Sequence, residues 1–183
     1  KRINRGDLLD SEYEKISEAA NKYNDNLIID SSYKSTVEGI KAKAIKLKNN
    51  GGLDCLIIDY LQLMKSKVHK ASRNREAEIS EISRELKLMS MELDIPVIAL
   101  SQLSREVERR EDKRPILSDL RDSGAIEQDA DMVIFLFRPE YYGITEDEAG
   151  NNVTGLCEIN IAKGRETGTG KVVLKFEPQY NLF

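Results

Sequence analysis

The sequence predicts an α/β fold, with a mainly parallel sheet flanked by helices and a β-hairpin near the C-terminal end. Short apolar runs such as Leu56–Ile58 and Pro96–Leu100 alternate with longer segments of helical periodicity. The runs do not alternate between apolar and polar residues, which is typical of strands covered on both faces. Near the end, Gly155–Lys163 and Lys171–Glu177 flank a Gly-rich turn, the pattern of a hairpin.

Length and composition fit a globular chain with one substantial core. The chain has 183 residues, 40% hydrophobic and 33% charged. No window approaches the length of a membrane span and no signal peptide opens the chain, so we expect no membrane association. Cys55 and Cys157 match no metal spacing and we expect free thiols. The net charge of −4 gives no support for nucleic-acid binding over the whole surface, so such a site must come from local basic loops.

The first third of the chain predicts two helices and a strand. Ser11 with Glu14 forms a capping-box pattern that opens a helix to about Tyr23. Leu27–Asp30 then predicts a short buried strand. A second capping box, Ser35 with Glu38, opens a helix to about Lys48, which the run 49–52 of two Asn and two Gly ends.

The middle of the chain predicts a basic loop, a long helix and the second strand. The segment Lys65–Arg75 has basic residues, no acidic residue and no apolar periodicity, so we expect a mobile loop. A helix is predicted from about Asn74 to Leu93. Its apolar stripe consists of Ile79, Ile82, Leu86, Met89 and Leu93. The strand Pro96–Leu100 follows, and then Arg105–Arg114, whose charges nearly balance and which we expect to be mainly surface.

The remaining segments predict a short helix, a strand and a loop before the hairpin. A short helix is predicted within Asp119–Gln128, with Ser118 or Asp119 as its N-cap. Asp131–Phe137 predicts a further apolar strand, and Pro139–Asn152 is acidic and Gly-containing, which is typical of a loop.

Two polar residues mark the candidate site. Asp59 and Gln102 each follow an apolar strand, and ligands of parallel sheets gather outside the carboxyl ends of the strands. A carboxylate for a metal ion beside a neutral amide for a phosphate oxygen or a water is a pairing found in nucleotide hydrolases. The alternative is that each residue simply caps a turn at the end of its strand.

Several motifs, in order, resemble the RecA-like motor domain of bacterial replicative DNA helicases, the DnaB family. They run from about Gly51 to the C-terminus. The matching segments are Leu56–Met64 (LIIDYLQLM), Glu78–Leu86 (EISEISREL), Pro96–Leu103 (PVIALSQL), Arg114–Asp131 (RPILSDLRDSGAIEQDAD) and Lys163–Arg165 (KGR). The resemblance implies an ATP-dependent DNA helicase that translocates on single-stranded DNA as a homo-hexamer. It further implies ATP and Mg²⁺ as cofactors, primase and a helicase loader as partners of the parent protein, and a cytoplasmic location.

The resemblance also implies roles for four residues at the nucleotide. Asp59 matches the Walker B aspartate that helps to hold magnesium on ATP, and Gln102 matches the glutamine that senses the γ-phosphate. Lys163 and Arg165 match the basic pair that reaches the ATP site of the neighbouring subunit. A planar guanidinium suits the charge that spreads over the phosphoryl oxygens in the transition state. The alternative for this pair is an ordinary basic hairpin turn.

Three residues match the family's contact with single-stranded DNA. Arg121 supplies charge, Gly124 lets a backbone N–H approach a phosphate, and Asp122 can only orient its neighbours. The alternative is that this stretch is merely the start of a helix, and both interpretations can hold together. The basic loop Lys65–Arg75 is a second candidate for DNA contact, with a solvated loop as its alternative.

The resemblance also implies that parts of the family's motor domain lie upstream of Lys1. The segment Gly164–Lys171 (GRETGTGK) looks like a phosphate-binding P-loop, but its spacing is wrong and a strand follows where a helix is needed. We therefore expect residues 1–183 to be a partial RecA-like domain, truncated at the N-terminus and lacking the P-loop and catalytic glutamate. Its sheet should then show a gap, a rearrangement or a site for pairing with another chain. The piece alone should neither bind ATP tightly nor hydrolyse it.

Two other functions stay open. A RecA-type recombination or repair ATPase would share the strand-end Asp and Gln but form a helical filament. A non-catalytic subunit-interaction module would retain the hairpin without turnover.

Overall fold

The computed structural model describes residues 6–21, 26–32, 36–66 and 75–183, with only the backbone described at 121–123. The predicted basic loop Lys65–Arg75 therefore lies largely outside the described residues. The chain divides into two compact units, Lys1–Tyr33 and Lys34–Phe183. Within the described residues, no helix combines the length and the apolar character that crossing a membrane requires.

The first unit contains the helix α1 (Asp10–Asn21), none of whose residues is buried. The helix is confirmed, but its cap differs from the prediction, because the Leu9 N–H donates to the Glu12 carboxylate at 2.8 Å. The predicted strand Leu27–Asp30 is wrong, since this segment forms no ladder. A strand exists only through hydrogen bonds to a partner, and the Ile29 side chain here is 81% exposed.

The second unit is built around the helix α3 (Arg75–Leu93), which contacts α2 (Val37–Asn50) and α4 (Gly124–Asp129). All five residues of its predicted apolar stripe are buried. They belong to the core cluster that also includes residues of α2, α4 and two strands. The cap of α2 is Thr36, whose hydroxyl accepts from the Gly39 N–H at 3.2 Å, while the predicted cap Ser35 lies outside the described residues.

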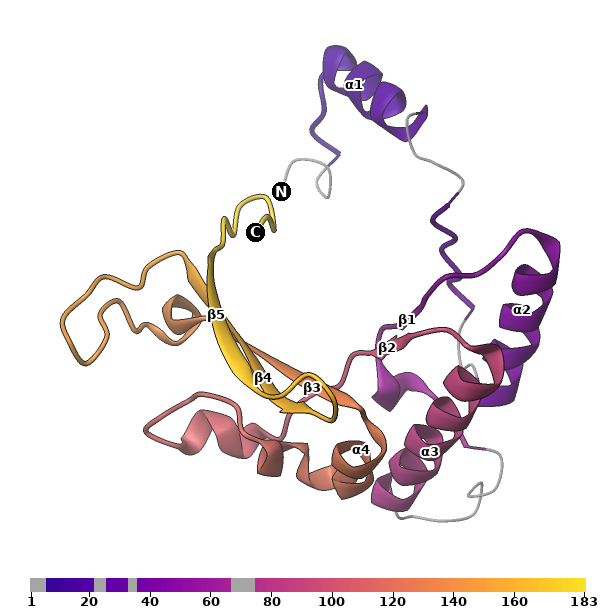
Figure 1. Ribbon diagram of the computed structural model, residues 1–183. Coiled ribbons are helices and arrows are strands. Elements are labelled where there is room, and N and C mark those ends of the chain that lie inside the picture. The colour runs from indigo at the N-terminus through magenta and orange to yellow at the C-terminus, as the bar shows by residue number, and fades with distance from the viewer. Residues whose placement is uncertain (1–5, 22–25, 33–35, 67–74) are drawn as a thin grey trace. The chain divides into compact units, whose positions relative to one another are not determined.

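The strands form two sheets (Figure 1). In one, β1 (Leu56–Ile58) pairs in parallel with β2 (Val97–Ala99). In the other, β3 (Met132–Phe137), β4 (Leu156–Gly164) and β5 (Gly170–Lys175) pair antiparallel in that order. The predicted C-terminal hairpin is thus confirmed as β4–β5. Since β2 and β3 do not pair with each other, the expectation of a gap or rearrangement in the sheet agrees with this topology.

The prediction that the strands are buried on both faces is wrong. Ile57 and Ile98, which face each other across β1 and β2, are 63% and 53% exposed. Along β3 buried and exposed residues alternate strictly. One face of β1 and of β3 packs into the core cluster, and the apolar side chains of their other face are exposed, while β5 is exposed along its whole length.

Short 3₁₀ helices fill the connections. They are η2 (Leu61–Leu63), η3 (Arg105–Arg109), η4 (Leu117–Ser123) and η5 (Pro139–Tyr142). The predicted short helix is therefore observed as η4 followed directly by α4. Its predicted N-cap is wrong, because Ile116 holds that position and the Asp119 carboxylate accepts from the Ile116 N–H at 2.7 Å. The predicted loop Pro139–Asn152 contains η5 and one bridge, Glu146 to Asn152.

Candidate functional site

Asp59 and Gln102 lie at the same edge of the parallel pair β1–β2. Beyond the strands, the Leu100 N–H donates to the Ile58 carbonyl at 2.9 Å and the Leu61 N–H donates to the Leu100 carbonyl at 2.9 Å. These bonds keep the two chain segments together past the last ladder residues. Asp59 and Gln102 consequently line one open cavity of about 330 Å³ with Tyr60, Leu100 and Ser101.

Gln62, on η2, ties the two segments at this edge. Its Nε2 donates to the Ser101 Oγ at 3.0 Å, and its Oε1 accepts from the Gln102 N–H at 3.2 Å. The backbone of Gln102 is thereby fixed while its side chain remains exposed. Sequence reasoning missed Gln62, although its position three residues after Asp59, inside the first family motif, was an available signal.

The cavity suits a metal ion that brings its own ligands. Within the described ranges no three His, Cys, Asp or Glu side chains gather as a metal-binding group, and Asp59 is the carboxylate that lines this cavity. Mg²⁺ typically keeps several waters and uses one or two carboxylates together with the phosphates of its substrate. The residues present therefore fit magnesium delivered with a nucleotide, and they do not form a protein-only cage.

Lys163 and Arg165 contact the carboxyl end of α4. The Lys163 ammonium, at the end of β4, donates to the Ala130 carbonyl at 2.7 Å and also to the Glu127 carbonyl. The Arg165 guanidinium donates to the Gln128 carbonyl at 3.0 Å. Neither residue lines the cavity of Asp59 and Gln102.

Asp131 is the carboxylate beside this basic pair. Its Oδ1 lies 3.1 Å from Arg165 Nη1, and its Oδ2 pairs with Lys87 of α3. The pKa of Asp131 is lowered, first by the hydrogen bond from Lys87 and further by the positive charges of Lys87, Arg165 and Lys163. Sequence reasoning missed Asp131 because its partners lie 34 and 44 residues away.

The glycine between the two basic residues is required by packing in the turn. A Cβ at Gly164 would lie 2.1 Å from the Gly168 carbonyl oxygen and 2.5 Å from Thr167 Oγ1. The Gly-rich stretch joins two antiparallel strands, which confirms that it is not a phosphate-binding loop ahead of a helix.

The three predicted DNA-contacting residues lie where η4 meets α4. Arg121 and Asp122 are in η4, and Gly124 is the first residue of α4. Gly124 has φ −52°, which any residue adopts, and a Cβ there would meet no atom within 4 Å. Neither strain nor internal packing accounts for glycine at this position.

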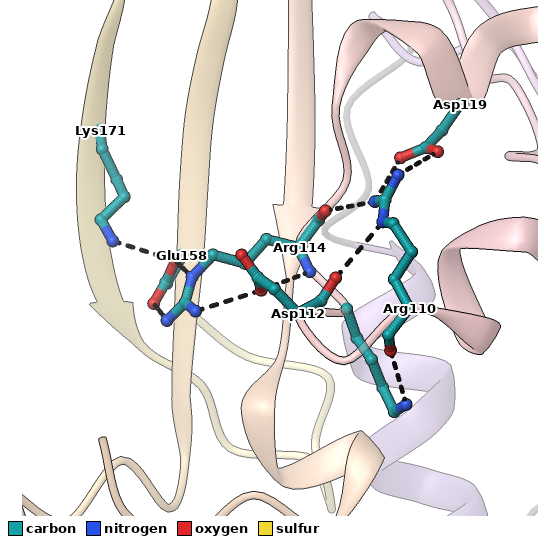
Figure 2. A network of polar contacts seen from close by, with 7 residues as sticks. Arg110, Asp112, Arg114, Asp119, Glu158 and Lys171 are labelled. Carbon is teal, nitrogen blue, oxygen red and sulfur yellow. Dashed lines mark hydrogen bonds and ion pairs between the residues drawn. The ribbon is translucent and has the colours of Figure 1, made fainter. Parts of the chain in front are cut away.

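A network of ion pairs joins the segment before η4 to the hairpin (Figure 2). Arg110 binds Asp119 with both Nη atoms, at 2.7 and 2.8 Å. Arg114 binds Glu158 of β4 through Nε and Nη2, both at 2.9 Å, and Lys171 of β5 adds a third contact at 3.0 Å. The expectation that Arg105–Arg114 is mainly surface is confirmed, since Val107 is its one buried residue, although Arg110 and Arg114 also bind buried carboxylates.

The carboxylates of this network are buried, and Glu158 is kept ionised by its hydrogen bonds from cations. Asp119 and Glu158 are only 4% and 8% exposed. The hydrogen bonds from Arg114 and then Lys171 lower the pKa of Glu158, although burial opposes them. The same hydrogen bond raises the pKa of Arg114. Arg114 also lies 5.0 Å from the centre of the Phe137 ring, so it bridges the buried carboxylate and the core face of β3.

Comparisons with known proteins identify the family of the chain. The family model for the DnaB-like helicase C-terminal domain matches residues 1–183. The chain is 45% identical over 182 residues to the replicative DNA helicase DnaB of Geobacillus stearothermophilus, and 46% identical over 182 residues to the replicative DNA helicase DnaC of Bacillus subtilis. Each alignment covers 99% of this chain and 39% of the relative, so the chain spans about two fifths of these proteins.

Two solved structures are similar over nearly the whole chain. One is the ATPase domain of another protein, with a TM-score of 0.87 and 41% identity, covering 100% of this chain and 63% of that one. The other is a DnaB-like replicative helicase studied with its primase interactions, with a TM-score of 0.83 and 41% identity, covering 97% and 42%. The α/β fold is therefore the RecA-like fold of these helicase domains, and the chain belongs to the DnaB-like helicase C-terminal domain family.

Proposed function

We propose that this chain is part of the motor of a replicative DNA helicase, which couples ATP hydrolysis to translocation on single-stranded DNA and to unwinding of the duplex. The observation that carries the proposal is the shared cavity of Asp59 and Gln102 at the carboxyl edge of a parallel strand pair. Ligands of such sheets bind at that edge, and the family to which the chain belongs supports a nucleoside triphosphate as the ligand.

Asp59 and Gln102, which line the cavity, and Gln62 beside it would have roles suited to their chemistry. Magnesium, when bound with ATP, would neutralise charge on the phosphate oxygens. Asp59 would hold that ion, and Gln102 would contact the γ-phosphate or the attacking water through its neutral amide. Gln62 would keep Gln102 in place, because it binds the Gln102 backbone and the Ser101 hydroxyl.

Lys163 and Arg165 would serve the ATP site of a neighbouring copy. They do not line the cavity of their own chain, so a role at the phosphates is best met from an adjacent subunit of a ring. A guanidinium brought in this way stabilises the charge of the transferring phosphoryl group. We therefore propose a homo-hexamer in which each site is completed by its neighbour.

The turn that carries Arg121, Asp122 and Gly124 would contact the phosphate backbone of single-stranded DNA. The open space beside Gly124 supports a close approach of backbone and phosphate. Such contacts are independent of sequence and weaken with salt. A relative studied with its primase interactions supports primase as a partner of the full-length protein, and we propose a helicase loader as a further partner.

The test is ATP hydrolysis by the full-length protein that contains this chain, with and without single-stranded DNA. Arg165→Ala should still form rings and bind ATP, but its turnover should fall by about 10³-fold or more. Mixed with wild type, it should lower the activity of the shared rings more than dilution does. Arg109→Ala, at an exposed arginine of η3, is the matched control and should hydrolyse ATP normally.

Normal turnover by Arg165→Ala would contradict the proposal and leave the hairpin a structural element. An open filament on DNA, seen by electron microscopy in place of a ring, would favour a recombination ATPase. The absence of ATP turnover by the full-length wild type would leave the interaction module.

A further inference from the structure

The helix α4 connects the turn that we propose contacts DNA with the basic pair, Lys163 and Arg165, that we propose serves the neighbouring ATP site. Its first residue, Gly124, belongs to the proposed DNA-contacting turn. Its last residue is Asp129, and the carbonyls of its final turn meet Lys163 and Arg165. A helix of six residues is about 9 Å long and too short to bend, so a shift at one end reaches the other.

The carboxyl end of α4 favours cations. The last carbonyls of a helix have no donors within the helix, and they carry partial negative charge. Lys163 donates hydrogen bonds to the carbonyls of Glu127 and Ala130, while Arg165 donates one to the carbonyl of Gln128. These contacts satisfy backbone groups that would otherwise need water.

Asp131 adds a carboxylate at the same point. Arg165 uses Nη2 on the Gln128 carbonyl and Nη1 on the Asp131 carboxylate, and its N–H donates to the Asp131 carbonyl at 2.8 Å. Both Nη atoms of the guanidinium thus have acceptors within one subunit. Arg165 cannot hold these contacts and bind a phosphate of another subunit with the same donors.

The Asp131 pair is well placed for reversible release. The Arg165 and Asp131 side chains are 52% and 56% exposed, and exposed pairs are weak enough to be displaced by a doubly charged phosphate. Lys87 of α3 also binds Asp131 and shares its charge with Arg165. Lys87 and Arg165 therefore compete for the Asp131 carboxylate, and a stronger Lys87–Asp131 pair weakens the Arg165–Asp131 pair.

We propose that Asp131 and the carboxyl end of α4 form a dock that keeps Lys163 and Arg165 on their own subunit, and that DNA bound at the opposite end of α4 releases them to the neighbouring ATP site. The dock would suppress hydrolysis when no DNA is bound. Asp131 is a positioning residue in this scheme, acting through Arg165. The inference rests on the proposed function of the basic pair.

The experiment compares ATP turnover of full-length variants with and without an oligo-dT strand. Asp131→Asn keeps the size of the side chain and removes its charge, so DNA-free turnover should rise roughly threefold and the stimulation by DNA should fall by the same factor. Asp131→Glu should restore most of the stimulation. Lys87→Gln should act in the opposite direction, because Arg165 then has the carboxylate to itself.

Glu177→Gln is the matched control. It makes the same change in an exposed pair, with Lys175, outside the dock, and its stimulation ratio should equal that of wild type. Ring assembly and melting temperature are measured for every variant, since a general loss of structure would lower both turnover values and leave their ratio unchanged.

Two results would overturn the dock. In the first, Asp131→Asn keeps the wild-type ratio of DNA-stimulated to DNA-free turnover. In the second, Asp131→Asn loses turnover in the way Arg165→Ala does, which would mean that Asp131 holds the finger in its active position. If Arg165→Ala itself hydrolyses ATP normally, the proposed function fails, and the dock fails with it because it has no finger to hold.

Discussion

The parallel pair β1–β2 and the antiparallel sheet β3–β5 differ in the exposure and hydrogen bonding of their polar side chains. At the edge of β1–β2, Asp59 and Gln102 are exposed. Within the part of the chain that the structure describes, no side chain donates a hydrogen bond to the Asp59 carboxylate. On β4, by contrast, Glu158 is buried and bound by Arg114 and Lys171 at once.

The difference distinguishes the residues that we propose bind a ligand from residues that stabilise the fold. A buried carboxylate must be paired, or its desolvation makes the fold unstable. An exposed carboxylate at a strand end costs little and stays available for a cation that arrives with its substrate. Substitutions at the edge of β1–β2 should therefore lower activity, and substitutions at the buried charges of β4 should lower stability.

The largest effect should follow a change at the open edge. Asp59→Asn in the full-length protein should lower ATP turnover by at least about 100-fold, because a neutral amide is a weaker ligand for a metal cation than a carboxylate. Its melting temperature should stay within a degree or two of wild type, since Asp59 is exposed. Asp54→Asn, an exposed residue just before β1 and outside the cavity, should retain full turnover.

The next effect should appear in stability. Glu158→Gln leaves Arg114 and Lys171 without their carboxylate, and the free energy of unfolding in urea should fall by about 2 kcal/mol. Glu177→Gln, in its exposed pair, should change it by less than about 0.5 kcal/mol. Equal losses in the two variants would erase the contrast between buried and exposed charge.

The contribution of Glu158 to the free energy of unfolding should depend on pH. The folded pKa of Glu158 lies below the ordinary value of 4.5, so its stabilising contribution is complete above that pH. As the pH falls through 4.5 toward the folded pKa, the unfolded chain takes up the proton first and this stability is lost. The unfolding free energies of wild type and Glu158→Gln should therefore converge below pH 4.5, and a constant difference would contradict the assignment.

A smaller loss should come from the hairpin turn. Gly164→Ala forces a Cβ against the Gly168 carbonyl, and the expected cost in unfolding free energy is about 1–2 kcal/mol. At Gly170, which also lies at the end of the hairpin, a Cβ would meet no atom within 4 Å. Gly170→Ala should therefore be tolerated, and a cost equal to that of Gly164→Ala would show that the close approach is not the cause.

The smallest effect should come from Gln62. Gln62→Ala removes the bonds to Ser101 and to the Gln102 backbone, so DNA-stimulated turnover should fall by roughly three- to tenfold through misplacement of Gln102. Gln62→Glu keeps an acceptor for the Gln102 N–H and loses the donor to Ser101, so its loss should be intermediate. Wild-type turnover in both variants would leave Gln62 a structural residue only.

Local sequence signals were enough to predict several elements of the fold and of the site. The stripe of α3 follows the helical period, and Asp59 and Gln102 each end an apolar run, so their shared edge could be expected from parallel strands alone. The hairpin was visible in its two apolar segments and Gly-rich turn. The family motifs, which are runs of neighbouring residues, also needed no tertiary information.

The contacts between residues far apart in the sequence depend on the folded arrangement of the chain. Glu158 pairs with Arg114 across 44 residues, and Asp131 pairs with Lys87 and Arg165 across similar separations. The open faces of β1 and β2, like the failure of Leu27–Asp30 to form a strand, likewise depend on which element packs beside them. Burial, strand pairing and charge pairing belong to the folded chain as a whole, because each requires a partner that the local sequence does not name.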